Sequence, residues 1–428
     1  MNYSKAEKLN QITDKTLIVG IDVSKNFHVA RAQDFRGIEF GKSITFNNNH
    51  IGFTELGVWI GELMHENSKE TLIIGLEPTG PYWINLARYL RQNNIKVVTV
   101  NPMHVKKIKE LDDNSQTKTD FKDSKIIAQL VKDVRFSEPN LLVGDYESLR
   151  NAKNLREVMI KDLCRIKNQM HNWLDRYFPE YQVAYKDWEA KSFLTILKLY
   201  RFPSKIANVG SSEIYNALPG KLRKGVGLNK ITKLVNAAQN SIGTTVGLEM
   251  AEEELKYLLK QYHNISDEIS ALELKIENIC RRLPEVQKLL KIKGMGLSTT
   301  SGIISEIGDI RNYSHPDQLI KMAGLSLIEN SSGKKKGQTT ISKRGRSDLR
   351  KFMYQVIFSM LAKNEAFREL YKYFTERKKN QLKGRQAIMA LARKLLRIIY
   401  SIVINNSDYD ERKMLSDIKR PKEFLMTA

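Results

Sequence analysis

The sequence predicts a mixed α/β fold at the N-terminus followed by an all-α remainder. Short apolar runs of strand length occur only before about residue 140, and three-four helical spacing of apolar residues dominates after residue 145. Glycine and serine then gather where the later helices would break. With 428 residues, 41% of them apolar, the chain is long enough for two or three domains with their own cores. We predict domains at residues 1–145, 146–288 and 289–428.

The first predicted domain begins with three strands at hairpin spacing. "TLIVGIDVSK" is a short apolar run that ends in a polar turn, and "FHVARAQD" and "GIEFGKSITF" follow it closely. "TLIIGLEPTG" and "IKVVTVNP" are further buried runs, with helical patterns such as "YWINLARYLRQN" between them. Three tightly joined strands, followed by strands that alternate with helices, are typical of the ribonuclease-H-like α/β layout.

Two long helices are predicted in the middle domain from apolar residues that recur every three or four positions. The first contains Leu149, Ala152, Met159, Leu163, Ile166, Met170 and Trp173. The second contains Leu255, Leu258, Tyr262, Ile265, Ile269, Leu272, Ile276, Ile279 and Leu283, and stops at Pro284. This second pattern, of roughly four heptads, predicts a coiled coil within or between chains.

A helical insert, residues 185–245, is predicted between these two helices. "FPSKIANVGSS" and "NSIGTTVG" are interpreted as its loops. The insert contains no recognisable catalytic pattern.

The charge of the chain predicts a polyanionic partner. It has 70 Lys and Arg against 48 Asp and Glu, a net charge of +22, and the basic residues crowd into the C-terminal third. Nucleic acid is the expected partner before an anionic membrane. Cys164 and Cys280 lie far apart in helical patterns, which excludes a disulfide framework and a zinc site and indicates a reducing compartment. No apolar run approaches a membrane span or a signal peptide, so we expect a cytoplasmic protein without a membrane partner.

Four acidic residues are candidate metal ligands. Asp22 ends the first strand in "VGIDVSK", and Glu77 ends a later strand in "IGLEPTG". Adjacent parallel strands would bring these two tips together. In "SQTKTDFKDSKIIAQLV", Asp120 and Asp123 stand three residues apart at the start of an amphipathic helix, so both can point into the same cleft.

Such a cluster favours divalent metal chemistry. Carboxylates a few Å apart raise one another's pKa unless cations are present, and hard oxygen ligands suit Mg²⁺ or Mn²⁺. Two-metal sites commonly serve in-line displacement at phosphorus. Taken alone, Asp120 and Asp123 are better explained as a capping box, a purely structural role. The order of all four acids along a basic chain favours the metal site.

A second candidate site is the segment "KMAGLSLIENSSGKKKGQTTISKRGRSDLRKFMY". Ser331 and Ser332 precede a glycine, and the cations around them are Lys334, Lys335, Lys336, Lys343, Arg344, Arg346 and Arg350. A cationic loop of this kind can grip a phosphodiester and stabilise the charge that develops during attack by a serine. The residues alone do not distinguish this from a loop that only holds the nucleic-acid backbone.

Upstream, "LLKIKGMGLSTTSGIISEIGDI" contains Gly294 and Gly296 between two helical patterns. This is similar to a helix-hairpin-helix turn, in which glycines let backbone N–H groups approach a phosphate. The alternative is an ordinary turn between helices.

Together these segments resemble one family, the DEDD transposases of IS110-type insertion sequences, whose members are guided by a bridge RNA from their own element. The N-terminal similarity rests on "GIDVSK", "LEPTGPYW", "NPMHVKKIK" and "KTDFKDSKIIAQL". The C-terminal similarity rests on "IKGMGLSTTSGIISEIGDI", "AGLSLIENSSGKKKG" and "ISKRGRSDLR". The resemblance covers roughly residues 15 to 175 and 285 to 405, and the helical region between these two parts is longer than in the family pattern.

The resemblance implies which residues form the site. The acidic tetrad falls on Asp22, Glu77, Asp120 and Asp123, which would bind Mg²⁺ or Mn²⁺. The nucleophile falls on Ser332, with Ser331 as the alternative, because the family pattern places the serine directly before glycine.

The resemblance also implies an architecture and an activity. It implies a RuvC-like N-terminal domain, a coiled-coil region and a C-terminal transposase domain. Sites from different protomers would combine in a homodimer or homotetramer that holds a structured guide RNA and two double-stranded DNAs. The activity would be excision and insertion of the chain's own insertion sequence through a phosphoserine–DNA intermediate.

Two other functions remain open on the sequence. The first is a metal-dependent DNA nuclease of the Holliday-junction resolvase or DDE kind, without serine catalysis. The second is a non-catalytic architectural protein that binds nucleic acid, in which the four acids serve as caps and ion-pair partners.

Overall fold

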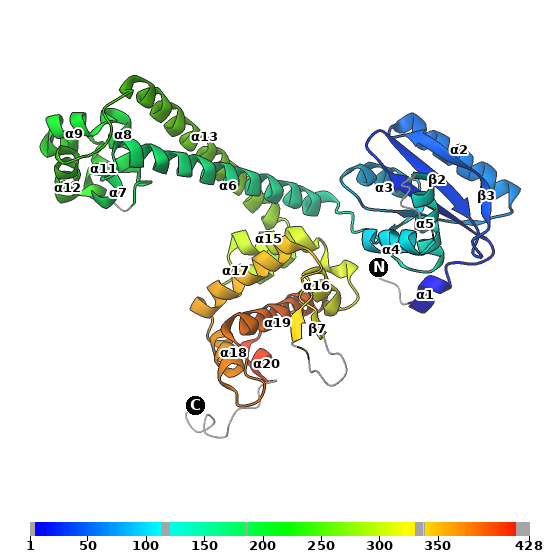
Figure 1. Cartoon of the computed structure of the whole chain (residues 1–428). Helices are drawn as coiled ribbons and strands as arrows, with labels where there is room; N and C mark the ends of the chain where they lie inside the picture. Colours follow the sequence, from blue (N-terminus) through cyan, green and yellow to red (C-terminus); the bar gives the residue numbers. More distant parts are fainter. Residues whose placement is uncertain (1–4, 113–119, 185–186, 330–336, 338, 417–428) are drawn as a thin grey trace. The chain divides into compact units, whose positions relative to one another are not determined.

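The computed structural model describes residues 5–112, 120–184, 187–329, 337 and 339–416 (Figure 1). The chain divides into two compact units. The first comprises residues 1–143, 307–354 and 369–428, and the second comprises residues 144–306 and 355–368. Among the described helices, none is long and apolar enough to cross a membrane.

The N-terminal part is built on a six-stranded sheet, as the apolar runs predict. The first three strands form an antiparallel meander, the next two lie parallel to the first strand, and a short last strand pairs antiparallel to the fifth. The sheet order is β3-β2-β1-β4-β5-β6. The strands are β1 (Thr16–Val23), β2 (Phe27–Gln33), β3 (Glu39–Asn47), β4 (Thr71–Leu76), β5 (Lys96–Val100) and β6 (Phe136–Ser137).

Helices cover both faces of this sheet (Figure 1). α2 (His50–Glu66) and α3 (Tyr82–Gln92) pack on the face that carries Leu17, Val19 and Ile21 of β1. α5 (Asp120–Lys132) packs on the face that carries Ile18 of β1 and Val98 of β5, next to α4 (Pro102–Asp112). The two faces are distinct because successive side chains of a strand point to opposite sides. The predicted mixed α/β N-terminal domain is therefore confirmed.

Two glycines let α5 lie directly on the sheet. Gly20 of β1 is the parallel register partner of Gly75 of β4. A methyl group on Gly20 would lie 2.2 Å from the Ser124 carbonyl oxygen, and one on Gly75 would lie 2.4 Å from Cγ2 of Val131. No side chain fits between the helix and the sheet at either position, so glycine is required by this close approach.

The second unit contains the two predicted long helices, α6 (Gly144–Tyr177) and α13 (Leu248–Arg281), each of 34 residues. They run antiparallel, because Trp173 near the end of α6 donates a hydrogen bond from Nε1 to the Ala251 carbonyl near the start of α13, at 2.9 Å. Farther along, Arg156 donates from Nε to Glu273 Oε1, also at 2.9 Å. The predicted apolar positions Leu255, Leu258, Ile269, Leu272 and Ile276 are buried.

In the described chain between α6 and α13, six short helices share a core with the adjoining ends of both long helices. They are α7 (Tyr181–Ala184), α8 (Lys191–Tyr200), α9 (Pro203–Val209), α10 (Ser211–Ala217), α11 (Gly220–Val226) and α12 (Leu228–Gln239). The loop predicted at "NSIGTTVG" is confirmed, but the loop predicted at "FPSKIANVGSS" is wrong over Pro203–Val209. Proline is favourable in the first turn of a helix, where its missing N–H group would have no helical partner, and Gly210 at φ +80° ends the helix.

The remaining chain is mostly helical, as predicted, with one unpredicted two-stranded hairpin. Its elements are α14 (Pro284–Leu290), α15 (Leu297–Ile307), the 3₁₀ turn η1 (Ile310–Asn312), α16 (Pro316–Met322), β7 (Leu327–Glu329), β8 (Thr339–Ile341), α17 (Ser347–Lys363), α18 (Glu365–Glu376), α19 (Gly384–Ile404) and α20 (Glu411–Leu415). A short helix, α1 (Lys5–Leu9), precedes β1.

Candidate functional site

Two of the four predicted acids are neighbours at one edge of the sheet. Asp22 lies near the end of β1, and Glu77 directly follows β4. The parallel register pairs Ile21 with Leu76. The residues that follow this pair, Asp22 and Glu77, are therefore also side by side. Adjacent strands are about 4.8 Å apart, so the two carboxylates start from neighbouring backbone positions. Both residues are half-buried, and Glu77 Oε1 accepts a hydrogen bond from Thr79 Oγ1 at 3.0 Å.

Asp22 and Glu77 lie on the face of the sheet that α5 covers. Each stands two residues after a glycine that contacts α5, Gly20 in one strand and Gly75 in the other. Because side chains two residues apart along a strand share a face, both carboxylates belong to the α5 side.

The direction of α5 brings its first turn toward the acidic edge. Lys132, the last residue of α5, lies near Gly37, with Nζ 3.4 Å from where a Gly37 methyl group would stand. Gly37 is in the β2–β3 turn, at the end of the sheet where β1 begins, because Ile18 pairs with Gln33. The first turn of α5, with Asp123, therefore lies toward the end where β1 and β4 finish.

Asp123 is buried, at 6% exposure, and forms an ion pair with Lys109 of α4. Its Oδ1 atom accepts no hydrogen bond from another group that the structure describes. A buried carboxylate is stable only beside a cation or with hydrogen-bond donors, and here the ammonium group of Lys109 supplies the positive charge. The sequence reasoning missed Lys109 because its partner is in another helix and no local spacing marks the pair.

Asp120 is the first residue of α5, one turn before Asp123. The side chain of Asp120 is outside the described part of the chain. Within that part, no group of three or more His, Cys, Asp or Glu residues is close enough to hold a metal ion.

The second predicted site falls largely outside the described residues. Ser331, Ser332, Lys334, Lys335 and Lys336 belong to the undescribed chain between β7 and β8.

Four predicted cations follow this segment, and the structure gives them different surroundings. Lys343 and Arg344 are exposed. Arg350 is half-buried, and its Nη1 atom donates to the carbonyl oxygens of Ala323 at 3.0 Å and Lys343 at 3.3 Å. Arg346 is half-buried, and its backbone N–H donates to a carbonyl oxygen of α16. Arg350 therefore holds the turn that presents Lys343 and Arg344 to solvent.

The two glycines of the predicted hairpin have different surroundings. Gly294 has φ +97°, and a methyl group there would lie 2.7 Å from the Cα atom of Met360 in α17. Gly294 is therefore required by backbone conformation and packing. Gly296 is exposed and has open space where a side chain would stand.

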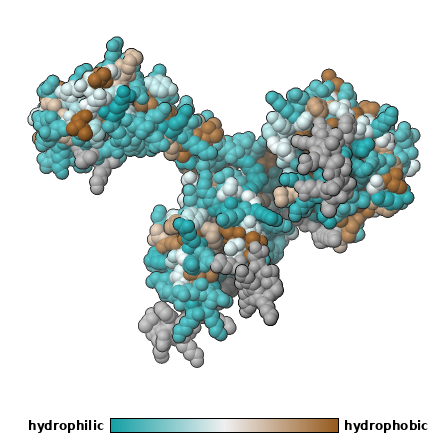
Figure 2. Space-filling view, viewed as in Figure 1, coloured by the Kyte–Doolittle hydropathy of each residue, from teal (hydrophilic) through white to brown (hydrophobic). Residues whose placement is uncertain are grey.

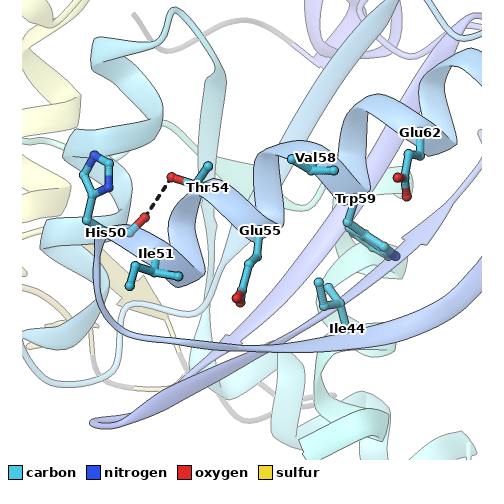
Figure 3. Close-up of a pocket in the computed structure, with 8 residues that line it drawn as sticks. All are labelled: Ile44, His50, Ile51, Thr54, Glu55, Val58, Trp59 and Glu62. Carbon is cyan, nitrogen blue, oxygen red and sulfur yellow. Dashed lines mark hydrogen bonds between the residues drawn. The ribbon is translucent and has the colours of Figure 1, made fainter.

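A hollow of about 500 Å³ on α2 and β3 is a separate feature (Figure 3). Within α2, Thr54 Oγ1 donates a hydrogen bond to the carbonyl oxygen of His50, one turn earlier, at 2.9 Å. Because α2 packs on the face opposite α5, this hollow does not include the predicted acids. It is lined by Ile44, His50, Ile51, Thr54, Glu55, Val58, Trp59 and Glu62.

Two family models match the chain. One, described as "Transposase" and named for the DEDD transposases of IS110, matches residues 19–179, and the other, "Transposase IS116/IS110/IS902 family", matches residues 286–372. Together the two matches span more than half of the chain. The first contains all four predicted acids, and the second contains the predicted serines.

Several known proteins are similar to all or part of the chain. The "Pilin gene-inverting protein" of Moraxella bovis is 25% identical over 407 residues, which cover 92% of this chain and 98% of that protein. The "Insertion element IS900 uncharacterized 42 kDa protein" of Mycobacterium paratuberculosis is 23% identical over 68% of this chain and 73% of its own length. The "Transposase for insertion sequence element IS1328" of Yersinia enterocolitica is 31% identical over 101 residues, which cover 24% of this chain and 30% of that protein.

The two models match the two parts of the chain that carry the sequence motifs, in the same order, and the relatives extend the similarity between them. The chain belongs to the IS110 family of DEDD transposases.

Proposed function

We propose that this transposase excises and inserts its own insertion sequence by combining the acidic site of a ribonuclease-H-like, RuvC-like domain with serine chemistry. The observation that carries the proposal is the neighbouring position of Asp22 and Glu77 on the face of the sheet covered by α5, whose first turn contains Asp123. Three acids far apart in the sequence thus come from elements that meet at one edge.

The acidic site fits a divalent cation on two grounds. Its donors are hard carboxylate oxygens, which suit Mg²⁺ or Mn²⁺. The buried Asp123 carboxylate is also paired with a cation, the ammonium group of Lys109. Asp22, Glu77, Asp120 and Asp123 would hold the metal, which when bound would polarise the scissile phosphate as a Lewis acid.

The serine step is assigned to Ser332, with Ser331 as the alternative. The serine oxygen forms a bond to phosphorus and gives up its proton, while a phosphorus–oxygen bond to deoxyribose breaks and the leaving oxygen takes a proton. The resulting phosphoserine linkage preserves one phosphodiester for rejoining. Lys343 and Arg344, both exposed, would hold the DNA backbone beside this segment.

The assembly proposed is a homodimer or homotetramer joined through a coiled coil that involves α6 and α13. Its support is a set of exposed apolar side chains on the outer surface of this helix pair. Leu155 and Val158 of α6 are 48% and 55% exposed, and Leu274 of α13 is 63% exposed. They lie at the same level of the pair, because neighbouring Arg156 and Glu273 are in contact. Exposed apolar side chains at this level of both helices favour contact with another subunit.

A bridge RNA is proposed as the guide, on the resemblance to the family and the net charge of +22. Base pairing to that RNA would select the DNA sequences, while Lys and Arg hold backbones irrespective of sequence. Sequencing the RNA that copurifies with the protein tests this part of the proposal. A discrete structured RNA encoded beside the gene is expected, and random cellular RNA would contradict guidance.

The serine mechanism is tested by Ser332→Ala, by Ser331→Ala and by the double variant. We expect Ser332→Ala to abolish recombination and the covalent protein–DNA adduct seen on a denaturing gel, while DNA binding is retained. Ser331→Ala is the matched control one residue away. Full recombination by the double variant would instead assign the chain to metal-dependent nucleases without a serine nucleophile.

A further inference from the structure

The helical segment between α6 and α13 is strongly basic. Residues 187–247, here called the tip module, contain nine Lys or Arg and three Asp or Glu. Two of the acids, Asp187 and Glu189, stand at its very start, and Glu189 pairs with Lys167 of α6. From residue 190 to residue 247 a single acid, Glu213, remains. The nine bases are Lys191, Lys198, Arg201, Lys205, Lys221, Arg223, Lys224, Lys230 and Lys233.

Several of these bases are exposed and unpaired within the described part of the chain. Lys198, Lys221, Lys224 and Lys233 are exposed and form no ion pair with any residue that the structure describes. Arg201, by contrast, is half-buried and pairs with Glu252 of α13 at 3.0 Å. Excess positive charge repels itself within a small module unless an anion is bound, so this distribution fits a polyanionic ligand. Figure 2 shows a mainly hydrophilic surface over this part of the molecule.

α12 presents one polar face that contains no acid. Ile231, Leu234, Val235 and Ala238 are buried on its inner side. Its exposed side carries Asn229, Lys233 and Asn236, spaced four and three residues apart and thus on one face. A helix of 12 residues is about 18 Å long and fits the major groove of duplex DNA. Asn and Lys are side-chain types that contact base edges and phosphates there.

A short sequence repeat links the tip module to the transposase region. "KGVGL" at residues 224–228 and "KGMGL" at residues 293–297 differ at one position, and each leads directly into a helix, α12 in the first case and α15 in the second. The second copy lies within a matched family model, and the first lies outside both matches. Gly225 and Gly227 have open space where side chains would stand, unlike Gly294, and Gly227 has φ +71°, a backbone conformation that favours glycine.

The side-chain composition of the exposed surface favours a double-stranded ligand. Proteins that hold single strands use exposed aromatic side chains on which bases stack. All five aromatic residues between residues 187 and 247 are buried or half-buried: Trp188, Phe193, Tyr200, Phe202 and Tyr215. The module offers cations and amides without a stacking surface, which suits the backbone and groove of a duplex.

We propose that the tip module is a second DNA-binding site, which holds duplex DNA through Lys221, Lys224 and the Asn229–Lys233–Asn236 face of α12. The proposal rests on the proposed function in one respect, that the chain acts on DNA. The module lies outside both matched regions of the sequence, so this site would be additional to the residues assigned to cutting and rejoining.

The test is DNA binding by the full chain in EDTA, measured by fluorescence anisotropy of a labelled 30-base-pair duplex at several salt concentrations. The test variant carries Lys221→Glu, Lys224→Glu and Lys233→Glu. The control carries Lys161→Glu, Lys260→Glu and Lys275→Glu, three exposed lysines of α6 and α13, and has the same net charge. We expect the test variant to bind at least about tenfold more weakly, with a salt slope smaller by about three, while the control changes less than about threefold.

Equal losses of duplex affinity in the test variant and the control variant would overturn the proposal. A set of Lys→Gln changes at the same three tip positions is measured if charge reversal lowers the melting temperature. An RNA hairpin with the same number of phosphates forms the second arm, and a loss confined to RNA would overturn the assignment to DNA. Because the assay involves no strand cleavage, tip-dependent binding by a chain that fails to recombine would contradict the proposed function and leave this inference standing.

Discussion

The acidic edge of the sheet and the tip module use charge in opposite ways. At the acidic edge, Asp22 and Glu77 are fixed by strand register, and Asp123 is buried beside Lys109. In the tip module, Lys221, Lys224 and other cations stand exposed on short helices. Buried charges are held in one geometry at a cost in desolvation, whereas exposed cations act together through a screened field. Single substitutions should therefore have large effects at the first region and small, additive effects at the second.

The largest expected effect is that of Asp123→Asn. An amide keeps the shape of the side chain and removes the charge that would bind a divalent cation, so we expect strand cleavage to fall by about 10³-fold, equivalent to about 4 kcal/mol. Cleavage of a labelled DNA substrate in Mg²⁺ or Mn²⁺ measures it. Asp133→Asn, an exposed acid just beyond the other end of α5, is the matched control and should leave the rate within about twofold. Equal activity of the two variants would remove Asp123 from the site.

Gly20→Ala tests whether the acidic region depends on the seating of α5. The added methyl group would stand 2.2 Å from the Ser124 carbonyl oxygen, so the helix must move away from β1. We expect a loss of about 3 kcal/mol in the stability of the α/β domain, measured by hydrogen exchange of β1 amides.

Gly57→Ala is the control for this change. Gly57 lies in α2 with open space where a side chain would stand, and alanine favours helix more than glycine does. We expect this variant to be up to about 1 kcal/mol more stable. If Gly20→Ala and Gly57→Ala changed the stability in the same direction, the close approach of α5 to the sheet would not be what stabilises this region.

Lys109→Met tests the ion pair at the acidic site. The substitution leaves the buried Asp123 carboxylate without its cation, so we expect the free energy of unfolding in EDTA to fall by about 2 kcal/mol. Mg²⁺ or Mn²⁺ should then raise the melting temperature of the variant more than that of the unchanged chain, because a metal that binds only the folded state stabilises it. Lys106→Met, an exposed neighbour in α4, should melt and respond to metal as the unchanged chain does.

How much the sequence could predict also differs between the two regions. Apolar runs and their polar ends were sufficient to predict the strands at whose ends Asp22 and Glu77 stand, because such runs are local signals. The parallel pairing of these strands follows from the predicted α/β layout. The glycines that seat α5 and the pairing of Lys109 with Asp123 could not be predicted, since both arise from contacts between elements distant in sequence. In the tip module, proline and glycine indicated a loop where Pro203–Val209 forms a helix. Short helices, such as the pairs separated only by Gly210 and by Gly227, leave no long apolar period from which their bounds could be predicted.

The smallest expected effect is that of a single tip lysine. Lys233→Ala removes one exposed cation that has no ion-pair partner among the described residues, so we expect duplex affinity to fall about two- to threefold for any DNA sequence and the salt slope to decrease by about one. Lys260→Ala on α13 is the control and should change neither quantity. If Lys233→Ala alone produced the whole loss of the triple tip variant, the module would bind through one specific contact. The contrast with the acidic edge would then fail, because the tip module would also depend on one charge in a defined position rather than on the combined electrostatic field of several cations.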